Sequence, residues 1–344
     1  MMKICIFIDS QGMGGIESHI IELVQGLMEH TQHEIDLMFW HSYNAVHPIT
    51  IQLNLLYSND SRLHYIDAHR SIKEFIRYCA IHKPIIHTHG YKAGIIARIV
   101  GAFTRTAIVS TFHNGDPGKG KLRLYNLLDR LTSFLSLNIA VNELISAPLH
   151  RCQVISNFVS TLDKATIKQQ ENSRNQIAFV GRLSHEKGPD IFAEITKKLP
   201  YPITMYGDGP MMSELKFTYS HIDYKGMCNM EEHWRNIRLL VMPSRYEGLP
   251  LAALEAMARG IPVIASNAGS IPKLLKECGI GKCIELHKLN QFELEIESTM
   301  QQTKEVYIKR GEKLIDYIDK NYSRRKNIPK ILDQYNIAAK LMME

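Results

Sequence analysis

The chain has 344 residues, a length that predicts two domains because a domain typically holds ~100–200 residues. Hydrophobic residues make up 45% of the chain and charged residues 22%, which is an ordinary globular composition and excludes disordered and fibrous classes. Lysine and arginine number 41 against 35 for aspartate and glutamate. This excess is too small to indicate nucleic-acid binding.

The cysteines and the N-terminus indicate a reduced, non-spanning protein. The six cysteines are scattered, without a CxxC pair, and no histidine cluster has the spacing of zinc ligands, so we expect free thiols and no metal. No window reaches ~18 uncharged apolar residues, and the first apolar run is too short for a secretion signal. We therefore expect a cytoplasmic location.

In the first half of the chain, short apolar runs alternate with segments of helical periodicity. The runs predict strands at 4–8, 35–40, 63–66, 85–88, 107–111 and 137–141. The periodic segments predict helices near 16–27, 72–80, 93–103 and 122–135. Strands that alternate with helices need crossover connections, which predicts a parallel sheet.

The second half repeats this pattern after a polar stretch, residues 161–175, which is nearly free of large apolar side chains. Strands are predicted at 177–180, 203–206, 222–224, 239–243 and 262–265, and helices at 189–199 and 251–259. From residue 292 on, only helices are expected. The fold class is thus α/β, with two Rossmann-like, doubly wound halves, and ligands bind such sheets at the carboxyl ends of their strands. Two facing halves would hold a ligand in the cleft between them.

A glycine-rich loop, residues 12–15, follows the first strand and opens the first helix. Residues without Cβ let backbone N–H groups approach an anion at a helix N-terminus, so a phosphate can bind there. A tight turn without a ligand is the alternative. The loop does not match G-x-G-x-x-G, because residue 17 is glutamate, and this argues against a dinucleotide site.

A second loop, residues 181–188, places Arg182 and Lys187 between a strand and a helix. The guanidinium can form two parallel hydrogen bonds to a phosphate, and the ammonium adds a compact positive charge. The two side chains therefore predict a diphosphate-binding site. Two solvated charges without a ligand are the alternative. The glycines at both ends of the loop favour the diphosphate-binding site.

Two glutamates, with seven residues between them, stand in the otherwise small and apolar segment 243–260. Glu255 falls within a helix among alanines, where a carboxylate needs a partner such as a pair of vicinal hydroxyls. Glu247 precedes that helix, where Gly248 and Leu249 offer N–H groups to an anion.

These residues give the chain a resemblance to the GT-B glycosyltransferases of retaining family 4, glycosyl transferases group 1. The resemblance rests on the following segments: the Gly-Gly pair at 14–15, IIHTHG at 85–90, STFHN at 110–114, FVGRLSHEKG at 179–188, YGDGP at 206–210, KG at 225–226 and PSRYEGLPLAALEAMARGIPVIAS at 243–266. It implies a GT-B fold and four parts of the chain: an acceptor-binding domain at 1–160, a linker at 161–175, a nucleotide-sugar-binding domain at 176–320, and a C-terminal helix at 321–344 that returns to the first domain.

The resemblance also implies roles for single residues. Glu255 would hold the ribose hydroxyls of the donor, Glu247 the hydroxyls of the donor sugar, and Arg182 with Lys187 the departing diphosphate. The remaining donor contacts would come from Gly14, Gly15, Gly226, Met227, Gly248 and Leu249. His113 would contact the donor sugar near the reacting carbon, although a structural core histidine remains the alternative. The catalytic set expected is Glu247, His113, Arg182 and Lys187.

The activity implied is hexosyl transfer with retained configuration, from a nucleotide-diphosphate sugar, expected to be a UDP-sugar, to an acceptor of the lipopolysaccharide, O-antigen or capsule type. The acceptor would be a glycolipid or an oligosaccharide. No cofactor or metal is expected, since cations and helix amides would stabilise the leaving phosphate and no Asp-x-Asp motif is present. The alternatives are a nucleotide-sugar epimerase and a silent nucleotide-sugar-binding subunit of a partner transferase.

The departures from the family pattern are Asn157-Phe158-Val159 and the segment 268–273, where Lys273 replaces an acid. The second departure borders the donor sugar and leaves its identity open.

A basic, apolar helix is expected within residues 119–134. Between residues 62 and 130 the chain holds twelve lysines and arginines against four acidic residues. Such a helix can lie on an anionic membrane, which predicts peripheral attachment to the inner face of the cell membrane. A solvated helix face over an ordinary core is the alternative. No nucleic-acid partner is expected.

Overall fold

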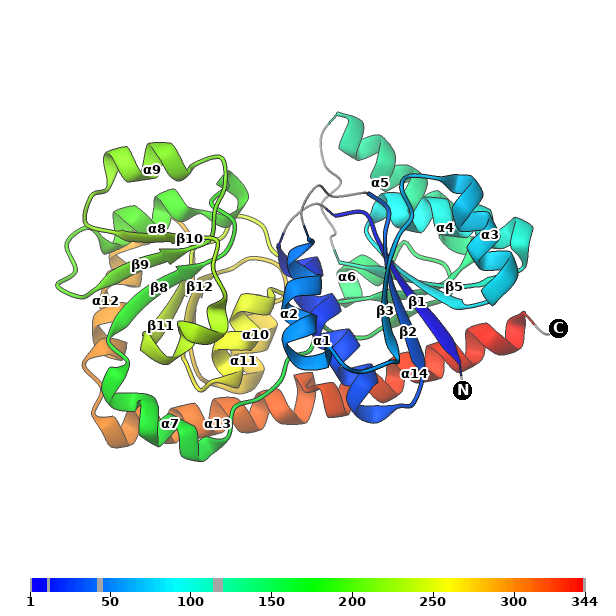
Figure 1. Ribbon diagram of the computed structural model, residues 1–344. Coiled ribbons are helices and arrows are strands. Elements are labelled where there is room, and N and C mark those ends of the chain that lie inside the picture. Colours follow the sequence, from blue (N-terminus) through cyan, green and yellow to red (C-terminus); the bar gives the residue numbers. More distant parts are fainter. Residues whose placement is uncertain (1, 11–12, 42–45, 114–119, 343–344) are drawn as a thin grey trace. The chain divides into compact units, whose positions relative to one another are not determined.

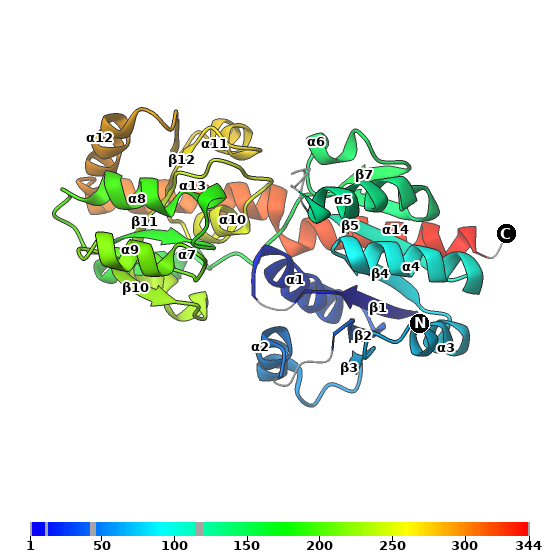
Figure 2. The ribbon, with the colours of Figure 1, turned by 90° about the horizontal axis from the view of Figure 1, so that it is seen from above.

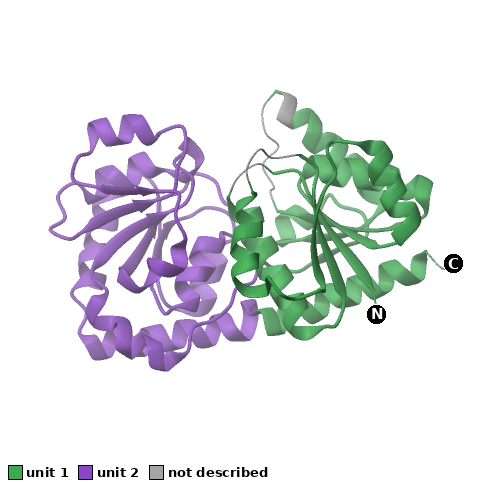
Figure 3. Cartoon of the chain, viewed as in Figure 1, with its two compact units in different colours: residues 1–157, 324–344 green, residues 158–323 purple. Residues whose placement is uncertain are grey.

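The computed structural model describes residues 2–10, 13–41, 46–113 and 120–342, with Lys121 and Leu122 described in their backbone only (Figure 1). Gly12 and Lys119, which belong to the predicted glycine loop and basic helix, lie outside the described residues. The chain forms two compact units (Figure 3). Unit 1 combines Met1–Asn157 with Arg324–Glu344, and unit 2 is Phe158–Ser323.

The described part of unit 1 contains a seven-stranded parallel sheet in the order β3-β2-β1-β4-β5-β6-β7. Its strands are β1 (Lys3–Ile8), β2 (Glu34–Phe39), β3 (Leu63–Asp67), β4 (Ile85–His89), β5 (Ala107–Phe112), β6 (Leu137–Ala140) and β7 (Cys152–Val154). Its helices are α1 (Gly15–His30), α2 (Pro48–Tyr57), α3 (Ile72–His82), α4 (Tyr91–Thr104), α5 (Lys121–Leu131), α6 (Glu143–Ser146) and α14 (Arg324–Leu341), with a 3-10 turn η1 at Thr132–Leu135. The strand order reverses between β1 and β4.

Helices cover both faces of this sheet, which explains the continuous apolar runs of its central strands. The side chains of Phe7 on β1 and Ile86 on β4 pack with Phe75 of α3 and with alanines of α4 in one core cluster. On the opposite face α14 lies against β4 and β5 and beside α1 (Figure 2). The Arg324 guanidinium at the start of α14 donates to Glu22 of α1 at 2.5 Å.

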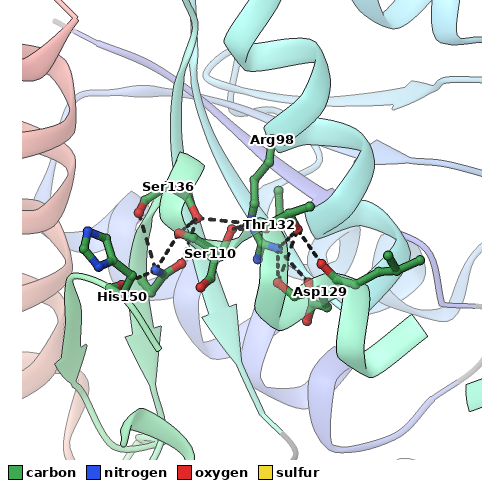
Figure 4. A network of polar contacts seen from close by, with 10 residues as sticks. Arg98, Ser110, Asp129, Thr132, Ser136 and His150 are labelled. Carbon is green, nitrogen blue, oxygen red and sulfur yellow. Dashed lines mark hydrogen bonds and ion pairs between the residues drawn. The ribbon is translucent and has the colours of Figure 1, made fainter. Parts of the chain in front are cut away.

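A buried arginine joins α4 to α5 and to the segment after α5 (Figure 4). The Arg98 side chain is 1% exposed. Its guanidinium donates to Asp129 Oδ1 at 2.8 Å, to Ser136 Oγ at 3.0 Å and to Ser110 Oγ of β5 at 3.2 Å. A buried guanidinium is tolerated when its donors are satisfied in this way. The network therefore fixes the end of the predicted 122–135 helix, which the structure divides into α5 and η1.

Unit 2 contains a six-stranded parallel sheet in the order β10-β9-β8-β11-β12-β13. Its strands are β8 (Gln176–Val180), β9 (Ile203–Tyr206), β10 (Asp223–Gly226), β11 (Ile237–Met242), β12 (Val263–Ser266) and β13 (Lys282–Ile284). Its helices are α7 (Lys164–Gln170), α8 (Pro189–Thr196), α9 (Met212–Thr218), α10 (Leu251–Ala258), α11 (Ile271–Cys278), α12 (Leu289–Met300) and α13 (Lys304–Tyr322), with 3-10 turns at Glu171–Ser173, His185–Lys187, Met230–Glu232 and Trp234–Asn236. The strand order reverses between β8 and β11. Both halves are thus Rossmann-like parallel-sheet domains, as the sequence predicts.

The stretch 161–175 is not a linker, and this prediction needs correction. It forms α7 and a 3-10 turn within unit 2. Asp163 caps α7 by accepting the N–H of Ala165, and Ile167 is fully buried beside Gly260 and Gly311. One isoleucine with a capping aspartate is enough to dock a short helix, although the rest of the segment is polar. The chain passes between the units at 157–158 and again at 323–324.

Candidate functional site

The loops after β8 and β11 lie side by side where the strand order of unit 2 reverses, which is the place where doubly wound sheets bind ligands. Gly188 ends the first loop with a φ of 69°, and a Cβ on it would lie 2.1 Å from the carbonyl oxygen of Pro243 in the second loop. Gly207, after β9, has a φ of 126°, and a Cβ there would lie 2.0 Å from the carbonyl oxygen of Gly181. Only glycine permits such close backbone contact in these conformations. The loops are therefore fixed against one another.

An ion pair connects the two loops. The Lys187 ammonium lies 2.8 Å from Glu247 Oε2, and Ser244 Oγ donates to Glu247 Oε1 at 2.8 Å. The Glu247 side chain is 2% exposed and that of Lys187 32% exposed. Both carboxylate oxygens of Glu247 thus have partners, whereas the ammonium keeps part of its surface open to solvent.

Arg245, which sequence reasoning assigned no role, holds the second loop in place. Its guanidinium binds Asp190 of α8 through two hydrogen bonds, at 2.9 Å and 2.6 Å, and donates to the carbonyl oxygen of His185 at 2.7 Å. Burial raises the pKa of Asp190, but the hydrogen bond and the charge of Arg245 lower it more, so the net shift is downward. The arginine stands inside the quoted 243–266 segment, but nothing in the sequence pattern names its acidic partner.

The N-terminus of α10 follows Glu247 closely and presents backbone N–H groups that no side chain caps. Pro250 is the N-cap residue, no side chain caps the helix, and its first turn contains no acidic residue. The segment after β12 supports this turn, since Gly269 has a φ of 55° and a Cβ on it would lie 2.2 Å from the Glu247 carbonyl oxygen. Ser270 N–H donates to the Gly248 carbonyl oxygen at 2.9 Å. The uncapped N–H groups of the first turn and the helix dipole favour an anion at this point.

The other predicted residues of unit 2 end or follow strands at this edge, or belong to the helix that begins after it. Arg182 is exposed directly after β8, and Glu255 is half-buried on α10, with its backbone carbonyl accepting from Arg259 at 3.0 Å. Gly226 ends β10 with a φ of 67°, and Met227 after it is exposed. The buried Leu249 packs in the core cluster of α10. Among the predicted residues, a direct side-chain contact joins Lys187 to Glu247.

The predicted residues of unit 1 lie at the carboxyl edge of its sheet. Gly14 is the N-cap of α1, and a Cβ on Gly15 would meet no atom of the described residues within 4 Å. His113 follows β5, and its Nε2 lies 3.0 Å from Nδ1 of His89 at the end of β4. Burial, followed by the neighbouring histidines His19 and His87, lowers the pKa of His113 well below its usual value. His113 is therefore a neutral imidazole within a cluster of histidines, which sequence reasoning missed because its members come from separate elements.

Two family models match the chain. The model described as Glycosyltransferase Family 4 matches residues 13–161, and the model described as Glycosyl transferases group 1 matches residues 174–301. Together the two matches span most of the chain.

Named relatives agree with these family models. The chain is 30% identical over 253 residues to the Escherichia coli UDP-Gal:alpha-D-GlcNAc-diphosphoundecaprenol alpha-1,3-galactosyltransferase, covering 60% of this chain and 64% of that protein. It is 26% identical to a 41.2 kDa protein of the Klebsiella pneumoniae cps region, of which it covers 66%. The chain thus spans slightly less than two thirds of these relatives. The amylovoran biosynthesis glycosyltransferase AmsD of Erwinia amylovora is 24% identical to this chain, and the match covers 81% of this chain and 85% of the length of AmsD.

Solved structures share the fold over nearly the whole chain. Anabaena HepE, in a crystal structure with UDP, matches with a TM-score of 0.77 over 97% of this chain and all of its own, at 15% identity. Staphylococcus aureus TarM matches with a TM-score of 0.77 over 98% of this chain and all of its own, at 14% identity. From the two family models, the named relatives and the two parallel-sheet units, we conclude that the chain belongs to the glycosyltransferases of the GT-B fold.

Proposed function

We propose that this protein transfers a hexose from a nucleotide-diphosphate sugar, specifically a UDP-sugar, to a lipid-linked or surface-glycan acceptor with retention of configuration. The observation that carries the proposal is the Lys187–Glu247 pair beside the uncapped N-terminus of α10. This arrangement places a cation, backbone N–H groups and a carboxylate within one loop pair. A sugar diphosphate carries the complementary groups, which are anionic oxygens and hydroxyls.

The positive groups bind the diphosphate in this scheme. The Lys187 ammonium has three donors, of which Glu247 takes one, and the others remain for a phosphate oxygen. The N–H groups at the start of α10 and the exposed guanidinium of Arg182 add to this positive field. Negative charge grows on the diphosphate as the sugar leaves, so donors already held in place stabilise the transition state by ~3–4 kcal/mol each. We therefore propose that transfer proceeds without a metal ion.

The carboxylates bind hydroxyls. The carboxylate oxygens of Glu247 accept hydrogen bonds from Ser244 and Lys187. Hydroxyls of the donor sugar can replace these two donors. Glu255, one helical turn into α10, is proposed to accept from the two ribose hydroxyls. The donor contacts of Gly14, Gly15 and His113 remain predictions from the family resemblance.

The relatives support the choice of donor and acceptor. The name of the Escherichia coli relative specifies a UDP-galactose donor and a diphosphoundecaprenol-linked acceptor, and further relatives are named for O-antigen and amylovoran biosynthesis. Anabaena HepE has been crystallised with UDP-glucose. We propose a UDP-sugar donor and a polyprenyl-diphosphate-linked glycan acceptor on this basis.

We also propose that unit 1 contacts an anionic membrane through α5 and η1. Within the described residues of the chain, no helix is long and apolar enough to cross a bilayer. The apolar side chains exposed on this segment are Leu124, Tyr125, Leu127, Leu128, Leu131 and Phe134. Arg123 and Arg130 accompany them, and each cation near an anionic surface adds ~1 kcal/mol of attraction. Co-sedimentation with vesicles tests this contact, and no difference between anionic and neutral vesicles would disprove it.

The donor assignment is tested by isothermal titration with UDP-, GDP- and ADP-sugars and by transfer assays on wild type, Lys187→Ala and Glu255→Gln. We expect UDP-sugar binding in the wild type and at least a 100-fold loss of kcat/KM in Lys187→Ala. Lys197→Ala is the matched control, because Lys197 is also paired with a glutamate in unit 2 but lies on the surface after α8. Wild-type donor affinity in both Lys187→Ala and Glu255→Gln would disprove the assignment.

The anomeric configuration of the product, read by NMR, tests retention. Activity that survives exhaustive chelation supports the metal-free scheme. Conversion of the donor without an acceptor would instead identify an epimerase.

A further inference from the structure

Three histidines from distant parts of the sequence meet at the carboxyl edge of the unit 1 sheet. His19 lies on α1, His89 ends β4 and His113 follows β5. One ring nitrogen from each lies within 4.8 Å of the corresponding atoms of the other two. The group is close to the point between β1 and β4 where the strand order reverses. Doubly wound sheets bind ligands at such points.

The spacing of the three rings suits one metal ion. Nδ1 of His89 and Nε2 of His113 are 3.0 Å apart, whereas two nitrogens about 2.1 Å from one zinc ion stand about 3.4 Å apart at the tetrahedral angle. The ring centroids of His19 and His113 are 4.8 Å apart, and those of His19 and His89 are 5.5 Å apart. Small rotations of the rings are therefore enough to aim three nitrogens at a common point.

The chemical state of the rings also suits a metal ion. Burial lowers the pKa of His19 to about 4 and those of His89 and His113 well below their usual value, so all three rings are neutral and carry a lone pair. Nε2 of His89 is buried and has no hydrogen-bond partner among the described residues. Nδ1 of His89 and Nε2 of His113 share one proton in a hydrogen bond. A divalent ion in the place of that proton would bind both lone pairs.

Surrounding residues hold the cluster in place. His87 lies two residues before His89 on β4, and its ring centroid is 4.3 Å from that of His89. Its own nitrogens are 2.7 Å from the hydroxyls of Tyr335 on α14 and Thr111 on β5. These two hydrogen bonds fix the ring of His87, against which the ring of His89 packs. His113 is partly exposed, which leaves a route for an ion and a position for water.

We propose that His19, His89 and His113 form a three-histidine site for a divalent transition-metal ion, with Zn²⁺ as the representative ion. Neutral imidazoles suit zinc, copper, iron and nickel and do not suit magnesium or calcium. The ion takes no part in the proposed diphosphate chemistry, which relies on unit 2 residues. If His113 also contacts the donor sugar, as the family resemblance implies, bound Zn²⁺ slows transfer.

Binding is tested on the full chain without a histidine tag, by equilibrium dialysis against Zn²⁺ after treatment with a chelator. We expect one equivalent of Zn²⁺ in the wild type and at least 100-fold weaker binding in His113→Ala and His19→Gln. His64→Ala is the matched control, because His64 is an exposed histidine of unit 1, and it should bind like the wild type. No stoichiometric Zn²⁺ in the wild type, or equal binding in His113→Ala, would overturn the proposal.

A second measurement needs no variant and so does not depend on how well the variants fold. X-ray absorption of the zinc-loaded wild-type protein counts the imidazoles around the ion. Three imidazoles support the site, and two or fewer overturn it. Because neither measurement involves the donor, a failed metal site and a failed glycosyltransferase assignment are distinguishable.

Discussion

His47 makes the stability of unit 1 sensitive to acid, through its position before α2. Its Nδ1 accepts the backbone N–H of Ile49 at 3.2 Å, and its ring packs 4.8 Å from that of Phe39. The residue is 4% exposed. Nδ1 can accept this hydrogen bond only when it carries no proton, so the folded protein requires the neutral ring. Burial lowers the pKa of His47 to about 4.

The sign and size of the effect follow from proton linkage. In the unfolded chain the His47 pKa is about 6.5, so between about pH 6.5 and pH 4 the unfolded state binds the proton and the folded state does not. The contribution is therefore fully present above about pH 6.5 and is lost as the pH falls toward 4. At pH 5 the difference from the unfolded pKa is about 1.5 units, or about 2 kcal/mol of the free energy of unfolding.

The assay uses the two tryptophans of the chain, of which Trp40 lies in unit 1 and Trp234 in unit 2. In a Trp234→Phe background, fluorescence during urea unfolding reports unit 1. His47→Asn keeps a capping acceptor but does not titrate. From pH 7 to pH 5 this variant should lose about 2 kcal/mol less stability than its parent, because the other histidines contribute equally to both proteins. Equal losses would refute the reasoning.

Three further predictions test the packing and the site. Arg98→Met should cost unit 1 about 3–5 kcal/mol in urea unfolding, because it leaves Asp129 buried without its cation; a loss below 1 kcal/mol would contradict this. Gly188→Ala should destabilise unit 2 and abolish donor binding in calorimetry, whereas Gly279→Ala, at a similar φ but in open space, should cost only about 1–2 kcal/mol. Glu247→Gln should lower kcat at least 100-fold while UDP affinity measured by calorimetry changes little, and unchanged turnover would exclude a catalytic role.

The sequence predicts the central strands well because they are buried on both faces. The apolar run 4–8, for example, corresponds to β1 (Lys3–Ile8), five of whose six residues are buried. The strands that were missed are β7 and β13, each three residues long at a sheet edge and partly exposed. A strand whose side chains are not covered carries no continuous apolar run, so periodicity cannot detect it.

The site is predicted less completely, because the spacing of residues along the sequence does not reveal contacts between residues that are far apart in the chain. The sequence predicts that Lys187 and Glu247 contact different parts of the donor, whereas in the structure their side chains bind one another across 60 positions of sequence. The histidine cluster was missed for the same reason. Metal motifs are recognised when ligands share an element, whereas His19, His89 and His113 come from three elements.

The glycines of unit 2 show which part of the site is rigid before any ligand arrives. A Cβ on Gly188, Gly207 or Gly269 would lie 2.0–2.2 Å from a carbonyl oxygen of a neighbouring loop. These contacts are between backbones, so they do not depend on the side chains that meet a ligand. Lys187 is held on this fixed frame and remains partly exposed. The frame thus places the charge in advance, and a ligand has to displace only the side-chain contacts of Glu247 with Lys187 and Ser244, which limits the reorganisation that binding requires.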